Sequence, residues 1–242
     1  MANFNTHVFA AAAVASFGAT VCTKLLNLPV STALLLSMGG TIGGVLPDID
    51  LKYSVPSKIL FSVFGAIAAV AWMFARLDDF AVLELWVLAI TIFLLVRFPV
   101  WGLFHQFTVH RGSLHSIVAA FMFAVLTAVV GEHVLHLPSD TSWLLSGFVF
   151  VGVLIHLTLD EIYSVDFMGA RIKRSFGSAL KILDMQRIAA SCLIVFVTLV
   201  AWLWTPPTDE LFALWAQNKP DCLQLLLPDY LIDAAIKATT SR

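Results

Sequence analysis

Four groups of polar residues interrupt the ends of long apolar stretches in this sequence. They are His7, then Asp48 and Asp50 in GGVLPDID, then His110, Arg111 and His115 in HRGSLHS, and finally His156 and Asp160 in HLTLDEI. Ionisable side chains at the margins of membrane helices are costly, so each group is a candidate functional site. Because imidazoles and carboxylates bind metals and transfer protons, the chemistry to consider is metal binding and acid–base catalysis.

Two of these groups have spacings that suit a shared ligand. His156 and Asp160 are four residues apart, so on a helix they share one face. There they can chelate one metal, the carboxylate can orient the imidazole, or the two can form an intramembrane hydrogen-bonded pair. Asp48 and Asp50 can both face one cation, or they can belong to a solvated acidic loop. His7, a single histidine at a helix start, fits an interfacial residue as well as a metal ligand.

The HRGSLHS segment combines two histidines with an arginine. His110 and His115 are five residues apart, and they can converge if Gly112 bends the chain. Arg111 offers a fixed guanidinium fork that suits phosphate or carboxylate oxygens. Packing alone explains such a group poorly, so the segment favours a functional interpretation.

Composition indicates that these groups are positioned by membrane helices. The chain has 242 residues, of which 60% are hydrophobic and 12% charged, whereas soluble domains carry about 45–50% apolar and about 25% charged residues. A net charge of −2 argues against nucleic acid as a partner. We expect an all-α, polytopic membrane helical bundle with about six or seven transmembrane helices, since a span needs about 20 apolar residues. The apolar stretches are 8–23, 30–46, 58–75, 81–104, 115–136, 142–162 and 188–204.

Basic residues predict how these helices are oriented. The loop after residue 162 is rich in lysine and arginine, which places it in the cytoplasm by the positive-inside rule. Counting back through the spans puts the N-terminus and all four polar groups at the cytoplasmic face. Residues 1–204 then form the membrane domain, with the bilayer as partner, and residues 205–242 form a tail with no predicted role.

Together, the four groups predict one metal site. Mixed imidazole and carboxylate ligands suit zinc first, with manganese or iron as alternatives. The number of candidates exceeds what one tetrahedral zinc requires, so one or two ions are expected, with some residues acting as general base. Asp50 or Asp160 is the candidate base, and Arg111 is the candidate for holding a substrate anion. The candidate ligands are His7, Asp48, Asp50, His110, His115, His156 and Asp160.

These motifs, in this order, resemble those of the YdjM-type family of inner-membrane proteins. The matching pieces are Asn5-Thr6-His7, LPDID, HRGSLHS and HLTLDEI, and the resemblance covers about residues 1–185. It implies a membrane-embedded, metal-dependent hydrolase of the bacterial inner membrane. The H-x-x-x-D element is also similar to one in zinc-dependent phospholipase C, an analogy that suggests a phosphoester or lipid-linked substrate.

Two other classes of function stay open at this point. Polar residues in membrane helices also mark ion pathways, so the chain could be an ion or metal transporter or channel. Transport would favour ligands near the bilayer midplane and matching halves of the chain, whereas these groups gather at one face and no internal repeat is visible. A catalytically silent membrane regulator that keeps a metal for stability is the third class. The sequence does not predict an oligomeric state.

Overall fold

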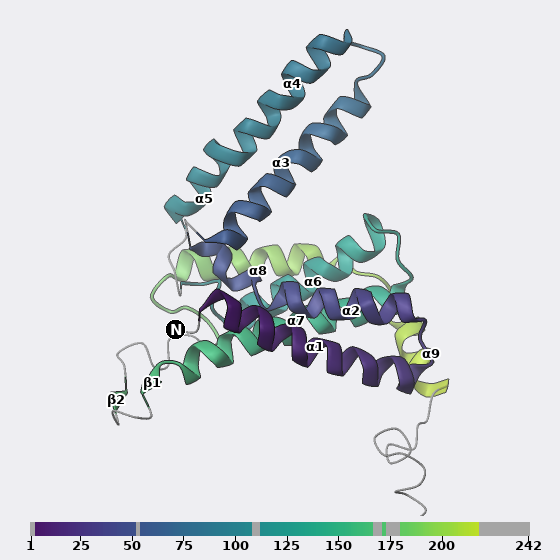
Figure 1. The fold of residues 1–242 in the computed structure, drawn as a ribbon, viewed down its shortest axis with the longest axis vertical. Coiled ribbons are helices and arrows are strands. Elements are labelled where there is room, and N and C mark those ends of the chain that lie inside the picture. The colour runs from purple at the N-terminus through teal and green to yellow at the C-terminus, as the bar shows by residue number, and fades with distance from the viewer. Residues whose placement is uncertain (1–2, 52–53, 108–111, 167–170, 173–179, 218–242) are drawn as a thin grey trace, which may run out of the picture. The chain divides into compact units, whose positions relative to one another are not determined.

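The computed structural model describes residues 3–51, 54–107, 112–166, 171–172 and 180–217, and these residues are mainly helical (Figure 1). They also include a short hairpin in which β1 (Val165–Asp166) pairs antiparallel with β2 (Arg171–Ile172). The predicted all-α class is therefore confirmed. The helices are α1 (Phe4–Leu26), α2 (Val30–Gly43), the 3₁₀-helix η1 (Leu46–Asp50), α3 (Val55–Ala75), α4 (Val82–Leu95), the π-helix η2 (Val96–Val100), α5 (Trp101–Phe107), α6 (Ile117–His133), α7 (Ser139–Ile162), α8 (Ile188–Trp202) and α9 (Asp209–Gln217).

Each of the seven predicted apolar stretches contains a helix, but among the described residues only four helices have the length and composition of a membrane span. These are α1, α3, α7 and the continuous helix Val82–Gln106 formed by α4, η2 and most of α5. The 14 residues of α2 extend only about 21 Å at 1.5 Å per residue, against about 30 Å of hydrocarbon. Helices α6 and α8 are also shorter, with 17 and 15 residues. The predicted count of six or seven spans is thus not confirmed, and four spans are supported.

The described residues form two compact units. Unit 1 contains Val45–Ala120 and Leu157–Phe196, and unit 2 contains Asn3–Gly44, Phe121–His156 and the described residues from Val197 onward. Helix α7 runs without a break from unit 2 into unit 1, and the boundary falls between His156 and Leu157. The two predicted ligands of this helix therefore belong to different units while standing on adjacent turns of one helix.

In unit 2, helix α2 packs closely against α1 and α7 through glycines. A Cβ at Gly40 would meet the Cβ of Ala15 on α1, and a Cβ at Gly43 would meet the backbone of Val149 on α7. Gly152 on α7 has no room for a side chain either, because its Cβ would strike the Gly40 carbonyl. Small residues thus let α2 approach both neighbouring helices closely.

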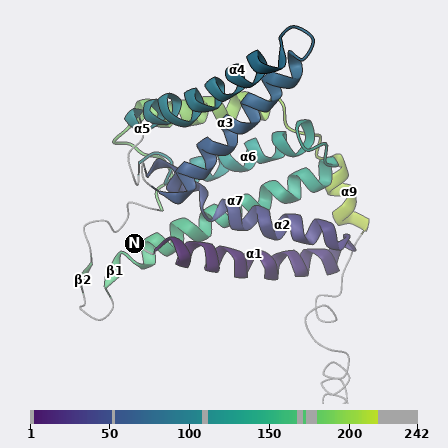
Figure 2. The same cartoon turned by 45° about the horizontal axis from the view of Figure 1, so that its top comes forward.

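The ends of α1 follow from local signals in the sequence. The Asn3 side chain caps the helix by accepting a hydrogen bond from the Thr6 amide at 2.8 Å. Asn27 ends the helix in the left-handed conformation with φ 52°, and Pro29 precedes α2. This short turn brings α2 back along α1, and Figures 1 and 2 show the two helices side by side.

In unit 1, α3 and the α4–η2–α5 helix form a long hairpin (Figure 2). Gly65 on α3 allows close approach, because a Cβ there would lie 3.1 Å from the ring of Phe93. Pro99 lies within the π-helical turn. Proline has no amide hydrogen to donate, so an irregular turn at this position is expected. The apolar side chains of Ile67 and Leu83 are exposed on this hairpin, as expected for a surface that faces lipid.

Candidate metal centre

Most of the predicted site residues fall in well-defined elements. His7 lies in α1, Asp48 and Asp50 lie in η1, His115 lies in the turn before α6, and His156 and Asp160 lie in α7. His110 and Arg111 lie outside the described residues, so their proposed roles stay predictions. The predicted contact between the two histidines of HRGSLHS is untested for the same reason.

In unit 2, the His156 ring is fixed by a main-chain contact. Its Nδ1 lies 2.8 Å from the carbonyl oxygen of Gly44 at the end of α2. Because a carbonyl can only accept a hydrogen bond, Nδ1 carries the proton and donates it to Gly44. In the neutral tautomer that this bond selects, Nε2 carries the lone pair, which is the arrangement of a histidine that binds a metal.

His7 lies directly against this ring. The two imidazoles stack with centroids 3.7 Å apart and planes inclined by 15°. His7 is 2% exposed and His156 is fully buried. The interpretation of His7 as a solvated interfacial residue is therefore wrong, and its placement supports the other reading, that of a candidate ligand.

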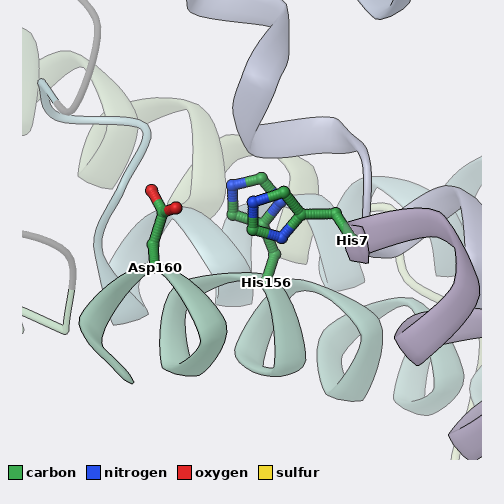
Figure 3. A group of neighbouring side chains, drawn as sticks. All are labelled: His7, His156 and Asp160. Atoms are coloured by element: carbon green, nitrogen blue, oxygen red, sulfur yellow. The ribbon is translucent and has the colours of Figure 1, made fainter. Parts of the chain in front are cut away.

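Figure 3 shows that Asp160 extends from the next turn of α7 toward the same side of that helix as the His156 ring. Asp160 is fully buried. The predicted sharing of one helical face by His156 and Asp160 holds, because the unbroken helix α7 carries both.

In unit 1, His115 lies between two carboxylates. Its Nδ1 is 3.2 Å from Oδ2 of Asp50, and its Nε2 is 3.9 Å from Oδ2 of Asp160. His115 is fully buried and Asp50 is 3% exposed, so a solvated acidic loop does not describe Asp50. Asp48 is only partly buried, and one of its oxygens lies within 4.8 Å of a ring nitrogen of His115.

The turn that carries His115 is held by local hydrogen bonds. The His115 amide donates to the Gly112 carbonyl at 3.1 Å, which closes a turn directly after the segment where a bend was expected. Ser116 caps α6, because its Oγ accepts from the Ala119 amide at 3.2 Å and donates to the Ser113 carbonyl at 2.8 Å. The imidazole is thus presented from the turn that precedes α6.

The donor set of these residues fits a divalent metal. Three imidazoles and up to three carboxylates match the preferences of zinc, manganese and iron better than those of calcium or magnesium, which favour oxygen ligands. Burial supports the same conclusion, since moving a carboxylate out of water costs several kcal/mol unless positive charge and hydrogen bonds offset that cost. A cation beside Asp50 and Asp160 would provide that charge.

Two features of this region had no clear signal in the sequence. The Gly44 carbonyl orients His156, but every residue has a carbonyl, so only the fold reveals this role. His105, close to the motifs in sequence, contacts a different partner: its Nε2 lies 2.8 Å from Oγ of the fully buried Ser57. The indole N–H of Trp101 also donates to Ser57 Oγ, at 3.1 Å.

Apolar helices of membrane-spanning length, together with buried histidines and aspartates at their ends, define an integral membrane protein with a candidate metal centre. The sequence model of the family described as YdjM inner membrane protein matches residues 1–216, and the chain belongs to that family. It is accordingly an integral inner membrane protein. Neither the curated proteins nor the solved structures contain a match to this chain.

Proposed function

We propose that this chain is a metal-dependent hydrolase of the inner membrane that acts on a phosphoester or lipid-linked substrate at the cytoplasmic face. The observation that carries the proposal is the buried series Asp50–His115–Asp160, in which an imidazole has a carboxylate facing each ring nitrogen. A purely structural polar contact would need one such carboxylate. Two of them, with His156 one turn away on α7, make a ligand set.

The geometry suggests a division of roles among these residues. Asp50 lies at hydrogen-bond distance from His115 Nδ1 and would orient that ring, which leaves Nε2 directed toward Asp160. In unit 1, His115 Nε2 and an Asp160 oxygen would then be metal ligands, together with Asp48. In unit 2, His156 Nε2 and His7 would be metal ligands. A bound divalent cation supplies Lewis-acid polarisation and makes water a better nucleophile near neutral pH.

Acid–base and substrate-binding roles follow from the same assignment. The Asp160 carboxylate has two oxygens, so one can bind the metal while the other accepts a proton from the attacking water. Asp50 is the alternative base. Arg111, together with His110, would bind the anionic oxygens of the substrate, because a guanidinium fork matches phosphate geometry. One or two ions, zinc first and manganese or iron next, are compatible with this set.

Metal analysis of the purified protein tests the proposal. The wild type is compared with His115→Ala/His156→Ala and with the matched control His133→Ala/His136→Ala, which removes two exposed histidines outside the cluster. We expect one or two equivalents of zinc, manganese or iron in the wild type and the control, and loss of that metal in the cluster variant. A folded, metal-replete wild type without stoichiometric metal would contradict the proposal.

Activity assays then separate the hydrolase from its rivals. Phosphodiester and phospholipid substrates are offered to the metal-loaded protein in detergent and in vesicles, with and without a chelator. Chelator-sensitive hydrolysis that is lost in the cluster variant supports the enzyme. Metal flux into vesicles without any hydrolysis would identify a transporter, and metal binding with neither activity would identify a silent regulator.

A further inference from the structure

A segment of unit 1 far from the ligands in sequence lies along the start of α6. The amides of Ile117 and Val118 donate to the carbonyls of Lys181 and Ile182 at 2.9 and 3.2 Å. The first amides of a helix have no partner within the helix itself, so these carbonyls satisfy two of them. We call residues 180–187 the strap, because this segment holds the first turn of α6 in place.

Asp184 is the centre of the strap. It is 4% exposed, although it is an ionisable residue. Its Oδ2 lies 3.2 Å from the Lys181 ammonium, and its Oδ1 accepts from the Gln186 amide at 3.3 Å. Its own carbonyl accepts from the Ser191 hydroxyl at 2.9 Å, which ties the strap to α8. A buried carboxylate with this many partners organises its surroundings.

One further contact joins Asp184 to the turn that carries His115. The Ser113 hydroxyl donates to Asp184 Oδ2 at 3.4 Å across 71 residues of sequence. Ser113 is two residues before His115, and its carbonyl accepts from Ser116, the cap of α6. The strap therefore contacts the His115 turn on both sides, through Ser113 before the histidine and through the first amides of α6 after it.

We propose that Asp184 is a positioning residue that fixes the His115 imidazole between Asp50 and Asp160. This inference rests on the proposed function, because the orientation of His115 matters for metal binding only if the cluster holds a metal. His115 is in a turn and has no helix of its own to hold it. Turns are the least rigid carriers for a ligand, so a site on a turn needs an external support. The strap supplies that support through Asp184.

The role is distinguishable from a general contribution to stability. A merely structural carboxylate would change the melting temperature and leave the metal site as it was. A positioning residue changes the affinity and the coordination geometry of the metal, and substitutions of groups that support a metal ligand typically cost 10–100-fold in affinity. Because Asp184 acts through Ser113 and the backbone, we expect its substitution to weaken metal affinity by roughly tenfold, the low end of that range.

The test uses Co²⁺ and Zn²⁺ with the full-length protein in detergent. Asp184→Asn and Ser113→Ala are compared with the wild type and with Asp140→Asn, which makes the same charge change in the first turn of α7. The Zn²⁺ affinity is measured by competition with a chelating dye, and the visible absorption of bound Co²⁺ reports coordination geometry. Melting of the metal-free protein reports stability separately.

We expect weaker Zn²⁺ binding and an altered Co²⁺ spectrum in Asp184→Asn and in Ser113→Ala, and wild-type values for Asp140→Asn. If Asp184→Asn does not fold, Ser113→Ala alone tests the proposal, because it removes only the side-chain link between Asp184 and the His115 turn. Wild-type affinity and spectrum in these two variants would overturn the positioning role, whatever their melting temperatures. A wild type that binds neither ion would overturn the metal centre itself.

Discussion

Replacing Gly152 by alanine tests whether the glycine contacts of unit 2 position His156. A Cβ at this position would strike the Gly40 carbonyl and would lie 2.8 Å from the Gly44 amide nitrogen. Both obstacles are backbone atoms, so no side-chain rotation can relieve them. Gly147 on the same helix is the matched control, because a Cβ there meets nothing within 4 Å.

The size of the effect follows from the contact distances. Ordinary van der Waals contact begins at 3.4 Å, so the Gly44 nitrogen must retreat from 2.8 Å to at least that distance. The neighbouring Gly44 carbonyl moves with it. A comparable shift of the 2.8 Å bond to His156 Nδ1 takes it outside the usual 2.7–3.2 Å range of hydrogen bonds. We expect destabilisation of about 1–3 kcal/mol from overpacking, and metal affinity lower by about 10–100-fold.

Two measurements check this prediction in detergent-solubilised protein. Thermal melting without metal gives the stability change, and the shift in melting temperature on adding Zn²⁺ gives the change in affinity. Gly147→Ala is expected to match the wild type in both. A Gly152→Ala protein that melts and binds Zn²⁺ like Gly147→Ala would refute the argument that this close approach holds His156.

Three further predictions concern the cap, the carboxylates and the orientation. Ser116→Ala removes the cap of α6 and should lower stability by about 0.5–2 kcal/mol in thermal melts, and an unchanged melt would contradict the cap assignment. Asp160→Asn should abolish stoichiometric metal in elemental analysis, whereas Asp50→Asn should weaken Zn²⁺ binding by about 10–100-fold, and equal effects would contradict the division of roles. In a background without native cysteines, Asn3→Cys should react with an impermeant thiol reagent only from the cytoplasmic side and Asp78→Cys only from the opposite side, and the reverse result would invert the predicted orientation.

Local rules predicted the parts of the site that one element carries. His156 and Asp160 share a face because four residues make about one helical turn, and this needs no tertiary information. The glycines of α2 are a local signal too, because a helix without side chains on one face can pack tightly. By contrast, the stack of His7 on His156 joins residues 149 positions apart, and spacing carries no signal for such a contact.

The predicted span count was not confirmed, for a related physical reason. Apolar composition continues through Gly44 and Val45, yet α2 ends at Gly43 and the chain turns into η1. Hydropathy measures how a residue partitions between water and an apolar phase. It does not indicate where backbone hydrogen bonding changes from one helix type to another. The same turn places Asp50 beside His115, so the feature that shortened the predicted span is also one that builds the site.

The placement of the cluster at helix ends has a physical consequence for its chemistry. A 3₁₀ turn carries Asp50, the turn before α6 carries His115, and the last turns of α7 carry Asp160. All three side chains are almost completely buried. Charges in such an environment are poorly screened, so a metal there would interact more strongly with its ligands and with a substrate anion than it would in water. A substrate anion must still be bound, and Arg111 is the residue proposed to hold it. An Arg111→Lys protein should therefore keep its metal and lose apparent affinity for a phosphoester, because an ammonium cannot reproduce the bidentate contact. Equal substrate affinity in the two proteins, measured with metal-loaded samples, would place the anion elsewhere.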